Sequence, residues 1–279
     1  MLRTIRKMYQ FFVDRPIKVG TVLNDRYEVL SVIGTGSYGL VYLCIELKTK
    51  EKRVIKQLRP SKRRNKKELM LFENEILVMR MLNHKNLPML YEAFSRNGHF
   101  FYVMSFIEGD NLEDQIFFRK TTFNEKESLL VLTLLLDLVE DLHKKGIYHQ
   151  DLRIPNMLLK NEELFLIDFG LSKHRGTVDS SHSSFHSSPN NQKDILVMKQ
   201  QDYYDLGEIL LYLLYTTYSP KNKKALPWTE ELSLEKETVH LLKRLLGINE
   251  PYSTTSEIST DLHAALKAKE TYMNRRMED

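Results

Sequence analysis

Residues 149–156 read H-Q-D-L-R-I-P-N and residues 167–170 read I-D-F-G, with a strand-like stretch between the two motifs. The motifs contain a candidate base, Asp151, an amide, Asn156, and a second carboxylate, Asp168. Phosphoryl transfer asks for little covalent chemistry from a protein, because positioning and charge neutralisation supply most of the catalysis. Side chains of these types on short turns suit a nucleoside triphosphate and its metal ions. The spacing therefore favours a phosphoryl-transfer site.

The composition is that of an ordinary globular protein. The chain has 279 residues, 42% hydrophobic and 28% charged, which is enough for one large domain or two lobes with separate cores. Lys and Arg number 41 against 37 Asp and Glu, and a net charge of +4 is too mild to indicate nucleic acid by itself. The single cysteine, Cys44, lies in an alternating strand-like run. We expect it to be buried, in a protein of the reducing cytoplasm.

Positive charge gathers in two candidate partner surfaces. Residues 59–67 (R-P-S-K-R-R-N-K-K) form either a solvated loop or a docking patch for an acidic protein, membrane surface or nucleic acid. Residues 1–20 predict a basic amphipathic extension, which either packs on the domain or lies on a membrane. The sequence has no run of about 18 apolar residues for a spanning helix, and no secretory signal. We expect a cytoplasmic protein, with peripheral membrane association as an alternative.

The first third of the chain alternates like β-strands, and the remainder has mostly helical periodicity. The expected strands are 27–33, 40–47, 52–58, 89–95 and 99–107, with a helix at 67–82. Further helices are expected at 111–118, 124–145, 202–217, 234–246 and 256–269, with a strand-and-turn region at 156–171. This order predicts an α+β protein of two lobes with a cleft between them. The predicted lobes are residues 21–108 and 109–279.

A glycine turn, G-T-G-S-Y-G, lies between the first two expected strands and contains Gly34, Gly36 and Gly39. Glycine lets the backbone turn tightly and approach phosphates closely. A strand follows this turn, whereas the dinucleotide-binding fingerprint requires a helix there, which argues against a dehydrogenase.

Lys56 lies in the third expected strand, where it requires a carboxylate partner to orient it towards phosphates. Glu75 in the following helix is the best candidate, and Glu68 and Glu73 are the surface alternatives.

Together these motifs resemble a protein kinase of the eukaryotic-like (Hanks) type, in the small soluble form found in bacteria. The resemblance extends from about Tyr27 to Ala268, and the motifs occur in the family's order. It implies a bilobal fold, with a β-rich N-lobe containing one main helix, a mostly α-helical C-lobe, and an ATP site between them. It also implies phosphoryl transfer from ATP to Ser/Thr hydroxyls of protein substrates, autophosphorylation included, with Mg²⁺ or Mn²⁺ as the metal.

The resemblance assigns a role to each of these polar residues. The implied catalytic set is Asp151, Lys56, Glu75, Arg153, Asn156 and Asp168. Asp151 would accept the substrate proton, and Arg153 would steady the γ-phosphate. Lys56, paired with Glu75, would hold the α- and β-phosphates. Asn156 and Asp168 would bind the metal.

The nucleotide pocket and the internal spine are implied in the same way. The residues implied to surround ATP are Ile33, Gly34, Gly36, Gly39, Val41, Val54, Lys56, the gatekeeper Met104, the hinge residues Ser105, Phe106 and Ile107, and Leu158. The implied spine consists of Met79, His149 and Phe169, anchored by Asp202.

The chain departs from the family at three places. Gln150 replaces the arginine that usually binds a phosphate on the activation segment, so phosphorylation there is not expected to be a strict on-switch. Arg153 replaces the usual lysine but still favours Ser/Thr specificity. The activation segment, about residues 168–200, is shortened and Ser-rich and has no A-P-E motif. The arginine that pairs with this glutamate is missing from residues 248–258, where Tyr252 lies near its place.

Two other functions stay open at this point. Small-molecule phosphotransferases of the kinase-like type also lack A-P-E, while an interaction module would bind ATP without turnover. A pseudokinase is disfavoured because the lysine, base and metal ligands are all present. The composition of the low-complexity stretch 172–194 predicts a flexible loop, and this interpretation is favoured over a metal site at His182 and His186, which lie four residues apart.

Overall fold

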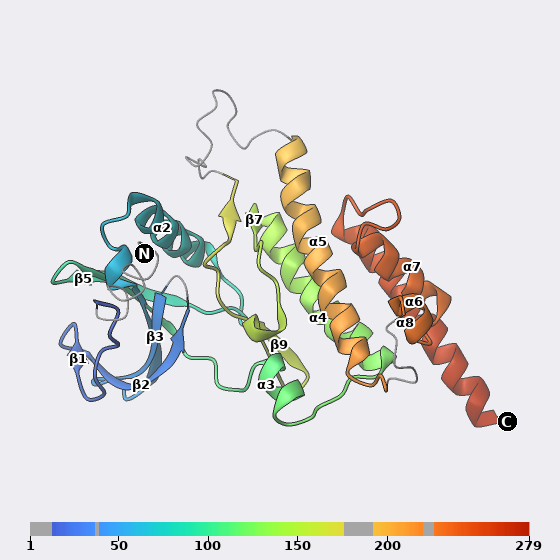
Figure 1. Ribbon diagram of the computed structural model, residues 1–279, viewed down its shortest axis with the longest axis horizontal. Helices are drawn as coiled ribbons and strands as arrows, with labels where there is room; N and C mark the ends of the chain where they lie inside the picture. The colour runs from blue at the N-terminus through green and yellow to red at the C-terminus, as the bar shows by residue number, and fades with distance from the viewer. Residues whose placement is uncertain (1–12, 37–38, 176–191, 220–225, 279) are drawn as a thin grey trace, which may run out of the picture. The chain divides into compact units, whose positions relative to one another are not determined.

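The computed structural model divides the chain into two compact units (Figure 1). The N-terminal unit comprises Met1–Glu108 and Phe169–Leu171, and the C-terminal unit comprises Gly109–Asp168 and Ser172–Asp279. The structure describes residues 13–36, 39–175, 192–219 and 226–278, with side chains up to residue 270. The short Phe169–Leu171 segment therefore groups with the N-terminal unit, although the sequence places it inside the C-terminal lobe.

The N-terminal unit is built on one antiparallel sheet of six strands in the order β1-β2-β3-β4-β6-β5. The strands are Val22–Leu23 (β1), Tyr27–Thr35 (β2), Gly39–Glu46 (β3), Lys52–Leu58 (β4), Leu90–Arg96 (β5) and His99–Ser105 (β6). A 3-10 turn, η1 (Pro60–Lys62), and the helix α2 (Lys66–Met81) follow β4. Strand β6 ends at Ser105, two residues earlier than the sequence predicted.

Side-chain alternation along β4 separates two apolar clusters. Ile55 belongs to the larger cluster, made of Leu23, Tyr27, Val29, Leu40, Tyr42, Cys44, Ile55, Phe101 and Val103. Leu58 belongs to the other, together with Phe72 of α2 and Tyr102. Cys44 is fully buried and free, and burial raises the pKa of its thiol to about 12, so the prediction of a packing role is confirmed.

The C-terminal unit is mainly helical. Its helices are Leu112–Phe117 (α3), Glu125–Lys144 (α4), Gln192–Tyr215 (α5), Trp228–Glu231 (α6), Lys236–Leu245 (α7) and Thr255–Glu278 (α8). Two small two-stranded sheets accompany them: Ile147–Tyr148 (β7) pairs with Lys173–His174 (β10), and Met157–Lys160 (β8) pairs with Glu163–Leu166 (β9) in a hairpin. Asn124 and Glu127 form a capping box that starts α4. The expected helix 256–269 extends further at its C-terminal end, to Glu278.

The prediction that α5 starts at residue 202 is wrong, because the helix begins at Gln192. Met198, Asp202 and Asp205 are buried at i, i+4 and i+7, so the inner face of the helix continues into its first turns. Asp194 in the first turn is favourable beside the positive end of the helix dipole. Residues 192–200, expected to form the end of the activation segment, are consequently helical.

Helices α5 and α7 approach closely at Gly207. A Cβ atom at this position would lie 2.9 Å from Cβ of Leu245, so a larger residue would force the helices apart. At the end of α7, Arg244 donates to Asp261 at 3.0 Å and to Glu257 at 2.9 Å. Its guanidinium lies 3.9 Å from the ring centroid of the buried Tyr252. The family has an arginine that pairs with A-P-E near the position of Tyr252. In this chain Arg244 contacts Tyr252 and binds α8 there.

Two other expectations concern the ends and loops of the chain. Most of the predicted N-terminal extension lies outside the described residues; within them, Val13 is helical and Pro16 follows the helix end. His182 and His186 also lie outside the described residues. Among the helices in the described ranges, none is long and apolar enough to cross a bilayer.

Candidate active site

Lys56 forms a buried ion pair with Glu75 of α2. Lys56 Nζ lies 2.6 Å from Glu75 Oε1, and the two side chains are 8% and 4% exposed. Tyr102 donates its hydroxyl to the same oxygen at 2.8 Å. Lys56 and Tyr102 are directly opposite across the β4–β6 ladder, so both point towards α2. The pair and the tyrosine together hold the ammonium group in one orientation.

The structure pairs Lys56 with Glu75, the candidate preferred from the sequence, and places the two alternative glutamates elsewhere. Glu68 pairs with Lys62 at 2.9 Å, and Glu73 is exposed. Sequence reasoning misses Tyr102 altogether, because a strand tyrosine belongs to none of the motifs. The strand register alone identifies it, by placing it opposite Lys56.

Three apolar side chains share the sheet face of Lys56. Val41 is directly opposite Lys56 on β3, and Val54 is directly opposite Met104 on β6. Val54 is also two residues from Lys56 along β4, which places it on the same face. An apolar surface of this kind, next to a fixed ammonium group, suits a flat base with attached phosphates. Ile33, another apolar candidate in this unit, is exposed on β2.

The glycine turn is described except for Ser37 and Tyr38. Gly39 has a packing reason of its own, since a Cβ atom there would lie 2.9 Å from the backbone oxygen of Gln57. Around Gly36, by contrast, an added Cβ would meet no described atom within 4 Å. Gly39 is therefore required by the close approach of β3 and β4, whereas no described atom crowds Gly36.

The expected hinge begins at Ser105. Its N–H donates to the Met89 carbonyl at 2.9 Å, and its Oγ accepts from the Met89 N–H at 3.0 Å. Phe106 and Ile107 follow the end of β6 and are half-buried, with Lys52 Nζ 5.5 Å from the Phe106 ring centroid. The two hydrogen bonds with Met89 thus fix Ser105 at the start of the hinge, while contacts of the hinge with adenine stay a prediction.

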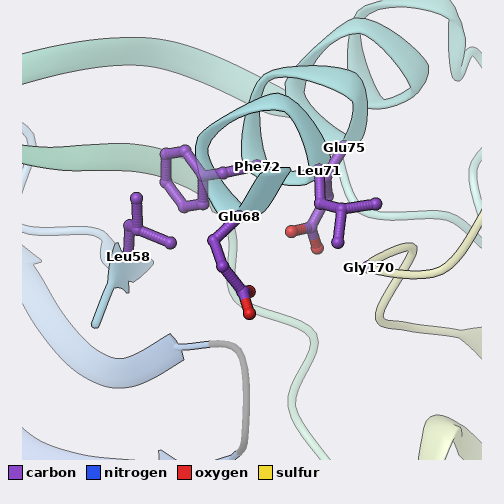
Figure 2. Close-up of a pocket in the computed structure, with 6 residues that line it drawn as sticks. All are labelled: Leu58, Glu68, Leu71, Phe72, Glu75 and Gly170. Atoms are coloured by element: carbon purple, nitrogen blue, oxygen red, sulfur yellow. The ribbon is translucent and has the colours of Figure 1, made fainter. Parts of the chain in front are cut away.

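A small pocket lies beside the Lys56–Glu75 pair within the N-terminal unit. It is lined by Leu58, Glu68, Leu71, Phe72, Glu75 and Gly170. Figure 2 shows the carboxylates of Glu68 and Glu75 extending from α2 into the space near the backbone at Gly170. The glycine of I-D-F-G therefore belongs to the surroundings of the ion pair.

In the C-terminal unit, Asp151 and Asn156 are joined directly. Asn156 is buried, and its Nδ2 donates to the Asp151 backbone oxygen at 3.1 Å and to Oδ2 at 3.4 Å. Arg153 Nε lies 3.3 Å from the same Oδ2. The Asp151 side chain is 30% exposed. It is thus held on two sides and still accessible to a substrate hydroxyl, as a general base has to be.

Asp168 lies next to this loop because the Ile167 N–H donates to the Asn156 carbonyl at 2.8 Å. Asp168 is exposed and has a left-handed backbone, with φ 67°, which aspartate tolerates better than most residues. Since Asn156 donates with Nδ2, its Oδ1 is the atom suited to a cation. Two oxygen ligands of this kind fit Mg²⁺, which usually takes one or two carboxylates together with substrate phosphates. No group of three or more His, Cys, Asp or Glu in the described part of the chain is arranged to hold a metal.

Asp202 of α5 fixes the backbone of residues 149–156, here called the catalytic loop by analogy with the family. Its carboxylate is fully buried and accepts from the His149 N–H at 3.0 Å and the Gln150 N–H at 2.7 Å. His143 Nε2 lies 2.7 Å from it. His149 is buried as well, and burial lowers the pKa of its imidazole, so the ring is neutral near pH 7. Met79 and Phe169 are buried in the N-terminal unit, and their stacking with His149 stays a prediction.

Asp205 is a second anchor that sequence reasoning misses. Its Oδ2 accepts from the N–H of Leu152, the residue that follows Asp151, at 3.1 Å, and its Oδ1 accepts from Gln201 Nε2 at 2.8 Å. The available signal is its spacing, three residues after Asp202 on one face of the same helix. Two adjacent carboxylates of α5 therefore hold successive segments of the catalytic loop.

Asp205 predicts a pH dependence of stability. Burial raises the pKa of its carboxyl from 3.8 to about 6, and Asp202 and Glu208 add to the shift. Between pH 3.8 and about 6, the Asp205 carboxyl is therefore protonated in the folded protein but ionised in the unfolded chain. The stabilisation is complete below a pH of about 4 and is lost as the pH rises through about 6, by roughly 3 kcal/mol. Urea unfolding from pH 4.5 to 7 should show the wild type losing stability relative to Asp205→Asn, and parallel curves would contradict this.

Gln150 is tied to α5 and has a left-handed backbone, with φ 64°. Its Nε2 donates to the Met198 carbonyl at 2.8 Å and to Asp202 Oδ1 at 3.2 Å. Within the C-terminal unit, this neutral side chain therefore provides contacts that hold the loop without a phosphate.

We predict that dephosphorylated protein keeps most of its initial rate, because these contacts are made without phosphate. The measurement is the initial rate after phosphatase treatment, with mass spectrometry following phosphorylation of residues 176–191 during the assay. A rate that is lost on dephosphorylation and returns only as these residues become phosphorylated would contradict the prediction.

Residues 27–269 match the sequence family described as "Protein kinase domain". The chain belongs to the protein kinase family. The kinase is 41% identical over 264 residues to the probable serine/threonine-protein kinase YbdM of Bacillus subtilis (strain 168), covering 95% of this chain and 98% of that protein. It is 31% identical to calcium-dependent protein kinase 4 of Plasmodium falciparum (isolate 3D7), covering 72% of this chain and 39% of that protein. The expected family and its bilobal fold class are confirmed.

Proposed function

We propose that this kinase transfers the γ-phosphoryl group of ATP to serine or threonine hydroxyls of protein substrates, itself included. The buried Lys56–Glu75 pair is the observation that supports this proposal most directly. A fixed ammonium group beside apolar side chains on one sheet face suits the phosphates and the base of a nucleoside triphosphate. The similarity to a serine/threonine-protein kinase over 95% of the chain favours protein over small-molecule substrates.

The roles of the residues follow from their chemistry. Lys56 neutralises the α- and β-phosphates, and Asp151 orients the substrate hydroxyl and accepts its proton. The hydroxyl oxygen forms a bond to the γ-phosphorus as the bond to the ADP oxygen breaks. Arg153, which lies beside Asp151, neutralises charge on the γ-phosphate. Asn156 and Asp168 would hold Mg²⁺, which supplies charge neutralisation at the phosphates.

The test uses the full-length protein with γ-labelled ATP and Mg²⁺. Generic protein substrates, the kinase itself and small alcohols are offered in parallel, and phosphoamino acid analysis identifies the acceptor. Label on serine or threonine is expected. Label only on a small alcohol supports the phosphotransferase alternative, and ATP binding without any transfer supports the interaction module.

A partner at the basic region is a separate proposal. Arg59 and Lys62 have intramolecular partners, whereas Arg64, Lys66 and Lys67 are exposed. An acidic partner would thus meet only the second half of residues 59–67.

We place the kinase in the cytoplasm, since the buried free Cys44 suits a reducing compartment.

A further inference from the structure

Asp14 is a buried carboxylate outside the region that matches the kinase family, which begins at residue 27. Its side chain is 4% exposed. Ser61 donates to it twice, from N–H to Oδ1 at 2.8 Å and from Oγ to Oδ2 at 2.8 Å, and Arg59 Nη1 donates to Oδ2 at 3.1 Å. A buried charge requires partners of this kind. The segment before the sheet is therefore fixed to the turn that follows β4.

Arg59 extends this contact to the glycine turn. Its Nε donates to the Gly36 carbonyl at 2.7 Å while Nη1 is bound to Asp14. The planar guanidinium can bind both partners at once because its donors have a fixed geometry. Arg59 lies three residues after Lys56, so one short segment carries both the phosphate-binding lysine and the donor to the turn.

At Gly36 the glycine turn is not crowded by other described residues. An added Cβ at Gly36 would meet no described atom within 4 Å, and glycine is itself conformationally permissive. Fixing one carbonyl of such a turn before the ligand arrives lowers the entropy cost of binding. A second tether, from the Ile17 N–H to the Tyr42 hydroxyl at 3.2 Å, holds the Asp14 segment on the sheet.

We propose that Arg59, oriented by Asp14, is a positioning residue that holds Gly36 of the glycine turn in place for binding the phosphates of ATP. The inference rests on the proposed function, since it assumes that this turn binds nucleotide. On this proposal, the segment that contains Asp14, before the kinase-family match begins at residue 27, contributes to nucleotide binding.

The test compares Arg59→Met and Asp14→Asn in the full-length protein. Losing one such hydrogen bond should raise KM for ATP, and Kd for the non-hydrolysable analogue AMP-PNP with Mg²⁺, by about five- to tenfold. The kcat value should stay close to that of the wild type. Arg64→Met removes the same charge from an exposed position in the same region and should leave both constants unchanged.

A purely structural role gives a different result. A lower melting temperature with unchanged Kd for AMP-PNP, or a lower kcat with unchanged KM, would overturn the inference. Should Asp14→Asn fail to fold, Arg59→Met decides alone, because its side chain is 21% exposed. Wild-type binding of AMP-PNP without transfer refutes the proposed function but leaves the Kd comparison valid, whereas no wild-type binding overturns both.

Discussion

Asp151→Asn is expected to lower kcat for phosphoryl transfer by orders of magnitude while nucleotide binding survives. The substitution keeps an oxygen near Asn156 and Arg153 but removes the group that accepts the hydroxyl proton. General-base catalysis contributes about 10²–10⁴-fold, so the loss in kcat should fall in this range. Transfer is measured with labelled ATP, and Kd for AMP-PNP is measured by calorimetry.

Asp137→Asn is the matched control, since Asp137 is an exposed residue of α4. It should have the wild-type rate and affinity. If Asp151→Asn also keeps the wild-type rate, Asp151 is not the base and the proposed mechanism is wrong.

Lys56→Met is expected to lower both activity and stability, because it leaves Glu75 buried without its ion-pair partner. Removing one member of a buried pair costs about 3–5 kcal/mol. The double variant Lys56→Met/Glu75→Gln should recover much of this loss, since a glutamine oxygen still accepts from Tyr102. It should not recover transfer, because no ammonium group remains for the phosphates.

Urea unfolding and transfer assays on the same preparations separate the two effects. Lys52→Met, a 51% exposed residue of the same strand, is the control and should be nearly neutral. Equal stability of the single and double variants would show that the buried charge is not what destabilises Lys56→Met.

The sequence alone predicted the family, the order of the lobes and the polar residues of both motifs. The predictions of the family and of the fold class are confirmed, because local patterns carry them: alternation predicts the strands, and turn residues at fixed spacing identify H-Q-D-L-R-I-P-N and I-D-F-G. The roles of the polar residues in these motifs stay predictions. The start of α5 was missed, because Lys193 and Asp194 obscure a buried face that continues through Met198.

Tertiary structure decided the partners of these residues. Strand register places Lys56 opposite Tyr102, packing of α2 brings Glu75 to it, and packing of α5 brings Asp205 to the catalytic loop. The contact of Asp14 with Arg59 joins residues 45 positions apart. Sequence spacing identifies which side chains have the right chemistry, but hydrogen bonds between distant segments depend on distances that only the folded backbone sets.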